Sequence, residues 1–371
     1  MTRTGQRGFT LIELMIALLV SSLLVGMILA IFSRMSLAYR SQQQIAGLQQ
    51  VLAAARATFE LDAKQAGLGM TQGFKIASTP TLQSPVQITN NSNSLGPDQI
   101  AFFYADTSTA GLIATNNLAT APNVVLADLP TGFAADMLVV LTTVSTAANP
   151  LGTGINPDVA TYDACVLKIS TIASAPSKQV NFYTTAPWGA PALTHCTNIT
   201  PGRTMMYPFV AHAYRIDPTP ARLATGVLQQ TSTGNLTSTE VWNDLAFGFS
   251  DIQTAVRTYN PAGTDLDLDG DPLRNWYSTG QDTVTNLATA PAGSSLLGVS
   301  ISLVAHTDRN VEGIATVLTP KLLGTPAANN PLGDHDEVPL PAASALLPDQ
   351  RIYRYTTFQI DFRNLGVGVG Q

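Results

Sequence analysis

Residues 8–32 read GFTLIELMIALLVSSLLVGMILAIF, and this stretch decides how the rest of the chain is interpreted. From Leu14 to Phe32 it carries no charge, and only two serines and a glycine interrupt the apolar residues. As a helix that rises 1.5 Å per residue, this run spans about 28 Å, close to the hydrocarbon core of a bilayer. A secretory signal or a simple membrane anchor would also be apolar here. The residues that follow, Ile31 to Arg34, make a poor signal-peptide cleavage site.

Glu13 does not fit either of these two interpretations. A carboxylate near the start of an apolar segment costs a few kcal/mol in lipid unless it has a partner, and such residues are usually functional. The eight residues at the N-terminus are short, polar and basic through Arg3 and Arg7. Glu13 is therefore the first candidate functional residue, and its partner must be identified.

The segment Gly8–Glu13 resembles the processing site of type IV pilins and type II secretion pseudopilins. The resemblance implies that a prepilin peptidase cuts after Gly8, removes residues 1–8 as a leader and methylates Phe9. It also implies that Glu13 pairs with the N-terminal ammonium of a neighbouring subunit. Each of these charges alone is costly in lipid, but as a pair they are tolerated. Removal of Arg3 and Arg7 from the 19 basic residues leaves 17 against 25 acidic ones, a net charge of −8.

The predicted helix continues beyond the apolar run. No proline occurs before Pro80, and Gly67 and Gly69 are suited to a helix C-terminus. From Ser41 onward, apolar residues recur at intervals of three and four, as on one face of a helix: Ile45, Leu48, Leu52, Ala55 and Phe59. We expect one helix within residues 9–67, from about Thr10 to Ala66. Residues 12–32 would span the membrane, and the second half would pack on the following domain.

The remaining residues, 68–371, predict a large antiparallel head rich in strands, which makes the fold class α+β. The resemblance implies the same pilin-like shape of a helical stem and a globular head. Short β-branched and aromatic runs mark the expected strands: Gln99–Ala105, Met137–Val144, Cys165–Ile169, Gln179–Thr184, Phe209–Ile216, Leu296–Ala305 and Arg351–Phe362. Long polar stretches between them are expected as loops: Asp106–Asn123, Ser145–Tyr162 and Thr325–Pro348.

The chain has two cysteines, Cys165 and Cys196. A head outside the cytoplasm would lie where disulfides persist. A bridge between them would close a loop of about 30 residues and stabilise the fold by about 3 kcal/mol in the chain-entropy model. We favour the disulfide; the alternative is two buried free thiols.

One acidic loop is a candidate calcium site. Carboxylates alternate along it, at Asp265, Asp267, Asp269 and Asp271, and Gly270 stands sixth. This is the first half of a D-x-D-x-D-G calcium loop, but the twelfth position is Trp276 where an EF-hand has a bidentate Glu. A closing ligand would have to come from elsewhere, with Asp251 and Asp282 as candidates. The alternative is a solvated acidic turn.

Composition excludes several classes of protein. Only 12% of the residues are charged, and the net charge of −6 does not favour a nucleic-acid binder. The sequence has no Gly-x-Ser-x-Gly motif and no phosphate loop, and its four histidines are not spaced as metal ligands on one element. We therefore expect no enzyme and no required cofactor, with structural Ca²⁺ as an option.

Several segments resemble minor pilins of the PilW family: Gln49–Met70, Phe249–Gln253, Asn275-Trp276, Gly298–Val304 and Arg354–Leu365. The resemblance covers residues 9–70 and 245–363, while 71–245 matches no pattern. It implies a minor pilin that primes type IV pilus assembly, with roles in adhesion and twitching motility. Before assembly the protein would lie in the bacterial inner membrane with its head in the periplasm, and afterwards in the extracellular pilus.

The implied partners are other minor and major pilins, prepilin peptidase, the inner-membrane assembly platform and a tip adhesin. Two alternatives stay open. One is a type II secretion pseudopilin, which shares the same leader. The other is a surface or adhesin-type binding module that uses the long polar loops of the head.

Overall fold

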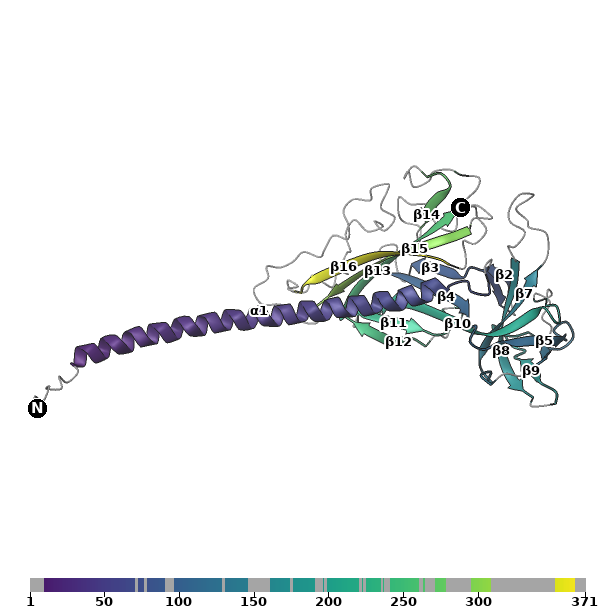
Figure 1. Cartoon of the computed structure of the whole chain (residues 1–371), viewed down its shortest axis with the longest axis horizontal. Coiled ribbons are helices and arrows are strands. Elements are labelled where there is room, and N and C mark those ends of the chain that lie inside the picture. The colour runs from purple at the N-terminus through teal and green to yellow at the C-terminus, as the bar shows by residue number, and fades with distance from the viewer. Residues whose placement is uncertain are drawn as a thin grey trace, which may run out of the picture.

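The computed structural model describes residues 10–70, 73–76, 79–90, 97–128, 131–145, 161–173, 176–190, 196, 199–219, 222, 225–234, 236, 241–259, 263, 271–277, 295–307 and 351–363. A single long helix, α1, extends far from a head built of strands, and the N-terminus lies at its free end (Figure 1). The expected fold class, a long N-terminal helix followed by a large β-rich head, is confirmed.

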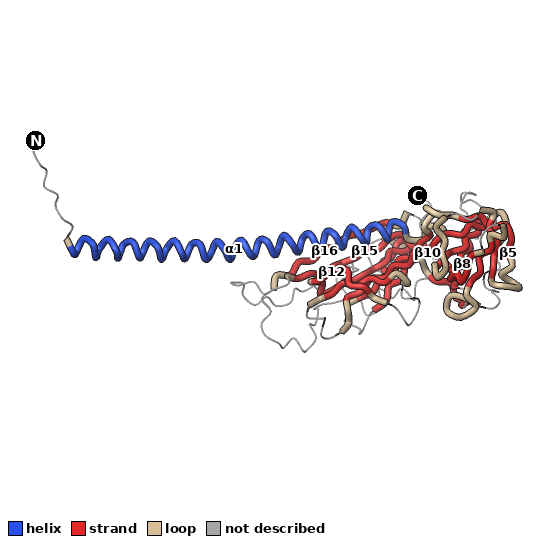
Figure 2. The backbone as a smooth tube through the Cα atoms, turned by 90° about the horizontal axis from the view of Figure 1, so that it is seen from below, coloured by secondary structure: helices blue, strands red, loops and turns tan. Residues whose placement is uncertain are grey.

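Helix α1 runs from Leu11 to Gln65 and is about 82 Å long at 1.5 Å per residue. Thr10 is its N-cap and Ala66 its C-cap, within a residue of the expected ends. Gly67 follows with φ +76°, a left-handed conformation that favours glycine at a helix end. The first half projects away from the head, and only the second half lies along it (Figure 2).

The strands beside α1 form two sheets. One is the near part of a twelve-stranded sheet. Its strands are β3 (Val86–Asn90), β4 (Asp98–Ala105), β10 (Thr204–Ile216), β11 (Val227–Thr231) and β12 (Asn243–Phe247). The other is a separate four-stranded sheet in the order β14-β13-β15-β16. Its strands are β13 (Phe249–Tyr259), β14 (Arg274–Tyr277), β15 (Ser295–His306) and β16 (Tyr353–Asp361).

The far part of the large sheet closes on itself beyond the end of α1. Strand β10 pairs with β5, and pairing continues through β6, β9, β8 and β7 back to β10. These strands are β5 (Gly111–Asn116), β6 (Asn123–Leu126), β7 (Leu138–Ser145), β8 (Thr161–Ile172) and β9 (Gln179–Phe182), with β1 (Phe74–Ile76) and β2 (Thr79–Gln83) continuing the sheet from β8. Buried apolar side chains of the ring strands, such as Val124, Leu141 and Leu167, form one cluster, as expected inside a small closed ring.

Strand β10 joins the ring to the part of the head that holds the helix. Its first half, Thr204–Pro208, pairs with β7, and its second half, Phe209–Arg215, pairs with β4. The second half contributes Tyr214 and Ile216 to a core shared by both sheets and α1. The position of the helix is therefore fixed by the same strand that closes the ring.

The chain passes from one sheet to the other at Gly248, between β12 and β13. Gly248 has φ +87°, and a Cβ there would lie 2.8 Å from the carbonyl oxygen of His306. Gly226 lies even closer to the chain at this point: a Cβ added at Gly226 would lie 2.2 Å from the carbonyl oxygen of Phe249. Both positions require glycine, and together they let the two sheets meet beside the helix.

One loop expectation was wrong. Residues 106–123 contain strand β5, which pairs with β6 and β10, so this polar stretch is part of the ring. Its alternating burial, with Gly111 and Ile113 inside, is a strand pattern hidden by Thr, Ala and Asn. The other two expected loops cannot be compared, because residues 146–160 and 325–348 lie outside the described residues.

Candidate functional site: the stem and its junction with the head

The stem begins with a capping box. The Thr10 N–H and hydroxyl each donate to Glu13 Oε2 at 2.9 Å, and the Glu13 N–H donates to Thr10 Oγ1 at 3.3 Å. The pattern Thr-x-x-Glu before an apolar run is a sequence signature of such a cap, so Thr10 is a partner of Glu13 within its own chain. Gly8 and Phe9, the predicted cleavage and methylation positions, lie outside the described residues.

The first part of α1 presents apolar side chains on every side. Leu11, Ile16, Leu24 and Phe32 are all more than half exposed, and so are most of the large side chains between them. Within the described ranges, α1 is the one helix long and apolar enough to cross a membrane, judged by length and composition. A helix that is apolar all round needs lipid or other helices for cover.

The first fully buried residue of the stem helix is Leu48. The predicted stripe of Leu48, Leu52, Ala55 and Phe59 is buried, and it contacts strands of both sheets. Ile45, the first residue of the predicted stripe, is only half-buried. Between the apolar run and Leu48, burial increases gradually, with half-buried residues from Ser41 onward.

The stripe ends in a buried carboxylate, Asp62, which is only 2% exposed. The hydroxyl of Tyr104 on β4 donates to Asp62 Oδ1 at 3.0 Å. On β10, the hydroxyl of Tyr214 donates to Oδ2 at 2.5 Å, and His212 Nδ1 lies 2.8 Å from the same oxygen. Two strands therefore converge on a single side chain near the end of the stem helix.

Both tyrosines are held as hydrogen-bond donors. Burial, and next the charge of Asp62, raise the pKa of Tyr104 and of Tyr214 well above the usual range, so both hydroxyls keep their protons. Tyr214 also accepts from Gln230 Nε2 at 3.0 Å, and its ring packs on Phe59 at 4.4 Å between centroids. This group, Asp62 with Tyr104, His212 and Tyr214, is called the stem anchor below.

Sequence reasoning did not identify the stem anchor. Asp62 stands three residues after Phe59, so it continues the predicted apolar stripe, and a carboxylate in that position was the available signal. Its partners are separated from it by 42, 150 and 152 residues and lie in the region that matched no sequence pattern.

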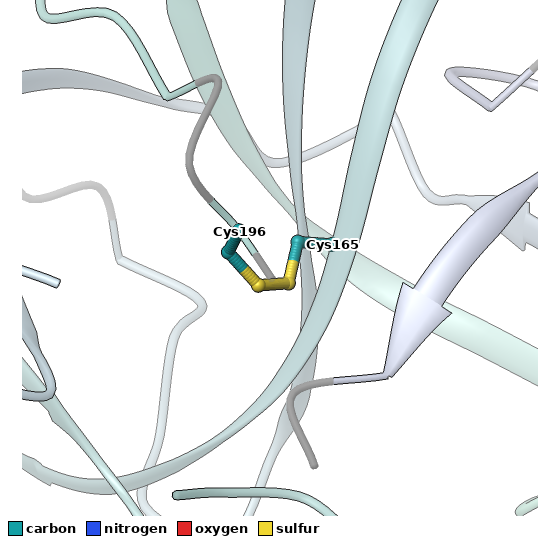
Figure 3. Close-up of a disulfide and its surroundings, with 2 residues drawn as sticks. All are labelled: Cys165 and Cys196. Atoms are coloured by element: carbon teal, nitrogen blue, oxygen red, sulfur yellow. A yellow bond between two sulfur atoms is a disulfide. The ribbon is translucent and has the colours of Figure 1, made fainter. Parts of the chain in front are cut away.

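Cys165 and Cys196 form the expected disulfide, with their Cα atoms 5.7 Å apart (Figure 3). Cys165 lies on β8, Cys196 lies in the chain before β10, and both are buried. The bridge joins the chain segment before β10 to the interior of the closed ring of strands β5 to β10, called the distal ring below. It lies away from the stem, so it is a stabilising element of the ring.

The acidic loop is described only at Asp271, because Asp265, Asp267, Asp269 and Asp282 lie outside the described residues. The Asp271 carboxylate accepts from the N–H of Leu273 at 3.1 Å and from Arg274 at 3.3 Å. Within the described part of the chain, no group of three or more His, Cys, Asp or Glu side chains could hold a metal. The calcium site stays a prediction.

Asp251, one of the two candidate closing ligands for that loop, lies within β13 and stays an untested candidate. It lies eight residues before the end of β13, and its carboxylate is buried. Its Oδ1 accepts from Gln253 Nε2 at 3.0 Å, and its Oδ2 is buried without a hydrogen-bond partner. Burial raises the pKa of Asp251 to about 7.

The chain is similar to a known sequence motif at its N-terminus and to a solved structure over most of its length. Residues 3–29 match the prokaryotic N-terminal methylation motif. A type IV-like pilin from Thermus thermophilus is similar over 86% of this chain and 97% of its own, with 11% sequence identity and a TM-score of 0.36. No curated protein is significantly similar to the chain.

Proposed function

We propose that this protein is a minor pilin that primes the assembly of a type IV pilus. The observation that carries the proposal is the methylation motif at residues 3–29 at the start of a helix of about 82 Å whose first half is apolar and uncovered. Such a stem has to be covered by lipid before assembly and by other stems afterwards. The role is structural and non-catalytic.

In this proposal the leader is cut after Gly8, and Phe9 becomes the methylated N-terminus. The position of Glu13 supports the pairing with a neighbour's N-terminal ammonium, since the carboxylate lies in the first turn of an exposed helix. Thr10 holds that carboxylate near the end of the stem, where the terminal ammonium of a neighbour would arrive. An ammonium and a carboxylate that meet in an apolar bundle offset each other's desolvation.

The size of the head favours a minor subunit at the tip or base over a repeating subunit. The segments that resemble the PilW family support the same assignment. Its partners would be other minor and major pilins, prepilin peptidase, the assembly platform and a tip adhesin. It would move from the inner membrane to the extracellular pilus as assembly proceeds.

The first test is a deletion strain of the native host. Loss of surface pili is expected, and normal pilus numbers would refute the proposal. A finer test is Glu13→Ala, which should abolish incorporation into filaments and leave the head folded. Glu60→Ala is the matched control, because Glu60 lies on the same helix and its ion pairs with Arg56 and Lys64 are at the surface.

A type II secretion pseudopilin is the alternative that shares the leader and stem. The same deletion strain separates the two, because a pseudopilin mutant retains pili and loses protein secretion. The distal ring, which lies beyond the end of α1, would suit a surface-binding role in either system (Figure 1). In this proposal Ca²⁺ is an optional structural ion, held by Asp265, Asp267, Asp269 and Asp271 shortly before β14 in the four-stranded sheet.

A further inference from the structure

Two arginines stand without acidic neighbours on the stem, just beyond its apolar run. Residues 14–59 contain three arginines and no acidic residue. Arg56, the last of them, pairs with Glu60 at 2.7 Å. Arg34 and Arg40 are exposed, and neither forms an ion pair with any residue that the structure describes. These two guanidinium groups are therefore available to a partner from outside the chain.

The two arginines do not follow the usual distribution of charge around a membrane span. Basic residues normally gather on the cytoplasmic side, where they set the orientation of the span. Arg34 and Arg40 follow the apolar run on the side of the head, and the leader carries an equal number, Arg3 and Arg7. Removal of the leader in the proposed function leaves the excess on the side of the head. Orientation therefore does not account for these residues.

The distance from the apolar run places both arginines near the level of lipid headgroups. They follow Phe32 by two and eight residues, which is about 3 and 12 Å along a helix. The headgroup layer adds about 5–8 Å on each side of the hydrocarbon core. Because the Cα–Cβ bonds of a helix tilt toward its N-terminus, the long side chain of Arg40 leans back toward the bilayer. Both guanidinium groups can thus reach the phosphates, as long basic side chains do at membrane surfaces.

Between the arginines the helix presents side chains suited to the same layer. Met35 and Tyr39, one turn apart on α1, are 64% and 68% exposed. At about 100° per residue, Arg34 and Arg40 flank this pair on either side of the helix. Tyrosine is enriched at membrane interfaces, because its ring is apolar while its hydroxyl stays in water. The four residues Arg34, Met35, Tyr39 and Arg40 are called the stem collar below.

The charge of the head leaves the stem collar as the part of the protein that attracts an anionic surface. Residues 66–371 carry 13 basic and 22 acidic residues, a net charge of −9, so anionic lipid repels the head. Acidic residues of a neighbouring subunit could also pair with the collar. Lipid phosphates, however, lie at that level before any neighbour arrives, and the planar guanidinium group binds phosphate with two parallel hydrogen bonds.

We propose that the stem collar binds the phosphates of anionic lipids on the head side of the membrane and holds the stem at a fixed depth before assembly. Each arginine near an anionic surface contributes a factor of about five in lipid preference, so the pair contributes roughly 30-fold. Extraction of the stem into a filament must break these contacts. The inference rests on the proposed function only in requiring a stem that spans a membrane first, which a pilus and a secretion pseudopilus share.

The test measures lipid binding to the full-length protein in detergent by native mass spectrometry, with phosphatidylglycerol and phosphatidylcholine as the probes. Every sample carries Arg3→Gln and Arg7→Gln, so that the leader adds no arginine. The unaltered collar should bind phosphatidylglycerol roughly 30-fold more tightly than phosphatidylcholine, and Arg34→Gln with Arg40→Gln should reduce this ratio to about one. The matched control is Arg56→Gln, on the same helix but in an ion pair with Glu60, which should leave the ratio unchanged.

A ratio near one with the unaltered collar, the same ratio with the collar variant, or an equal loss in Arg56→Gln would overturn the inference. The substituted positions on α1 are exposed, so the core stays intact, and the retained Cys165–Cys196 bridge reports a folded head. Failure of the proposed function is recognised separately: a deletion strain with normal pili refutes the pilus assignment, whatever lipid ratio the purified protein gives.

Discussion

Replacement of Asp62 should separate the stem from the head without unfolding the distal ring. In Asp62→Leu, the donors on Tyr104, His212 and Tyr214 lose their acceptor while the site remains buried. Breaking one side of a buried charged network costs about 3–5 kcal/mol. The added apolar contact of leucine offsets little of this, because the tyrosine hydroxyls stay in place.

Conservative variants can divide the free-energy cost of losing Asp62 among its hydrogen-bond partners. Tyr214→Phe removes one charge-assisted hydrogen bond and should cost about 1.5–3 kcal/mol. Asp62→Leu combined with Tyr214→Phe should cost less than the sum of the two single changes, because the second removes a donor already orphaned by the first. The measurement is urea unfolding of the full-length protein in detergent, followed by fluorescence and by hydrogen exchange in α1.

Glu60 supplies the control for this series. Glu60→Gln, two residues away on the same helix, removes only surface ion pairs with Arg56 and Lys64 and should cost less than about 1 kcal/mol. Exchange in residues 48–65 should accelerate in Asp62→Leu and remain unchanged in Glu60→Gln. If both variants unfold at the same urea concentration as the wild type, Asp62 does not fix the stem to the head.

Three further changes test other parts of the structure. Asp251→Asn should stabilise the protein at pH 8: burial raises the folded pKa of Asp251 to about 7, so its stabilising contribution is full below about pH 4 and is lost as the pH rises through 7. An unchanged pH dependence of urea unfolding between pH 4 and 8 would contradict this. Gly226→Ala should cost more than about 2 kcal/mol, because its Cβ would meet the Phe249 carbonyl at 2.2 Å, whereas Gly202→Ala, with φ +76° and open space, should cost about 1 kcal/mol. Asp267→Ala with Asp269→Ala should lower the melting temperature in calcium and not in chelator; a wild type that melts equally in both has no calcium site.

The stem could be predicted from sequence because its determinants are local. Apolar periodicity, the absence of proline before Pro80 and the glycines after Ala66 define a helix without reference to the rest of the chain. The buried stripe from Leu48 to Phe59 followed for the same reason. The capping box of Thr10 and Glu13 was equally local.

The head was less predictable because its architecture depends on distant pairings. The ring closes where Met205 on β10 lies opposite Leu112 on β5. Neither this strand pairing nor its register can be predicted from the local amino-acid composition. Strand β5 itself was interpreted as a loop, since Thr, Ala and Asn hide its alternation. The long strand β10 was predicted only in its second half, because Pro208 interrupts it at the change of partners.

The stem anchor also explains why the helix adopts one position on the head. Apolar packing is non-directional, and a stripe with residues every three or four positions could slide by one turn of 5.4 Å and still bury leucine and alanine. Such a slide would place Thr58 or Phe59 opposite the hydroxyls of Tyr104 and Tyr214, and it would move Asp62 into apolar surroundings. Each misplaced polar group would cost about 1–3 kcal/mol, more for the carboxylate. A single acidic residue at the end of the apolar stripe therefore sets the register of the stem, so that force applied along the helix reaches β4 and β10 at a fixed point.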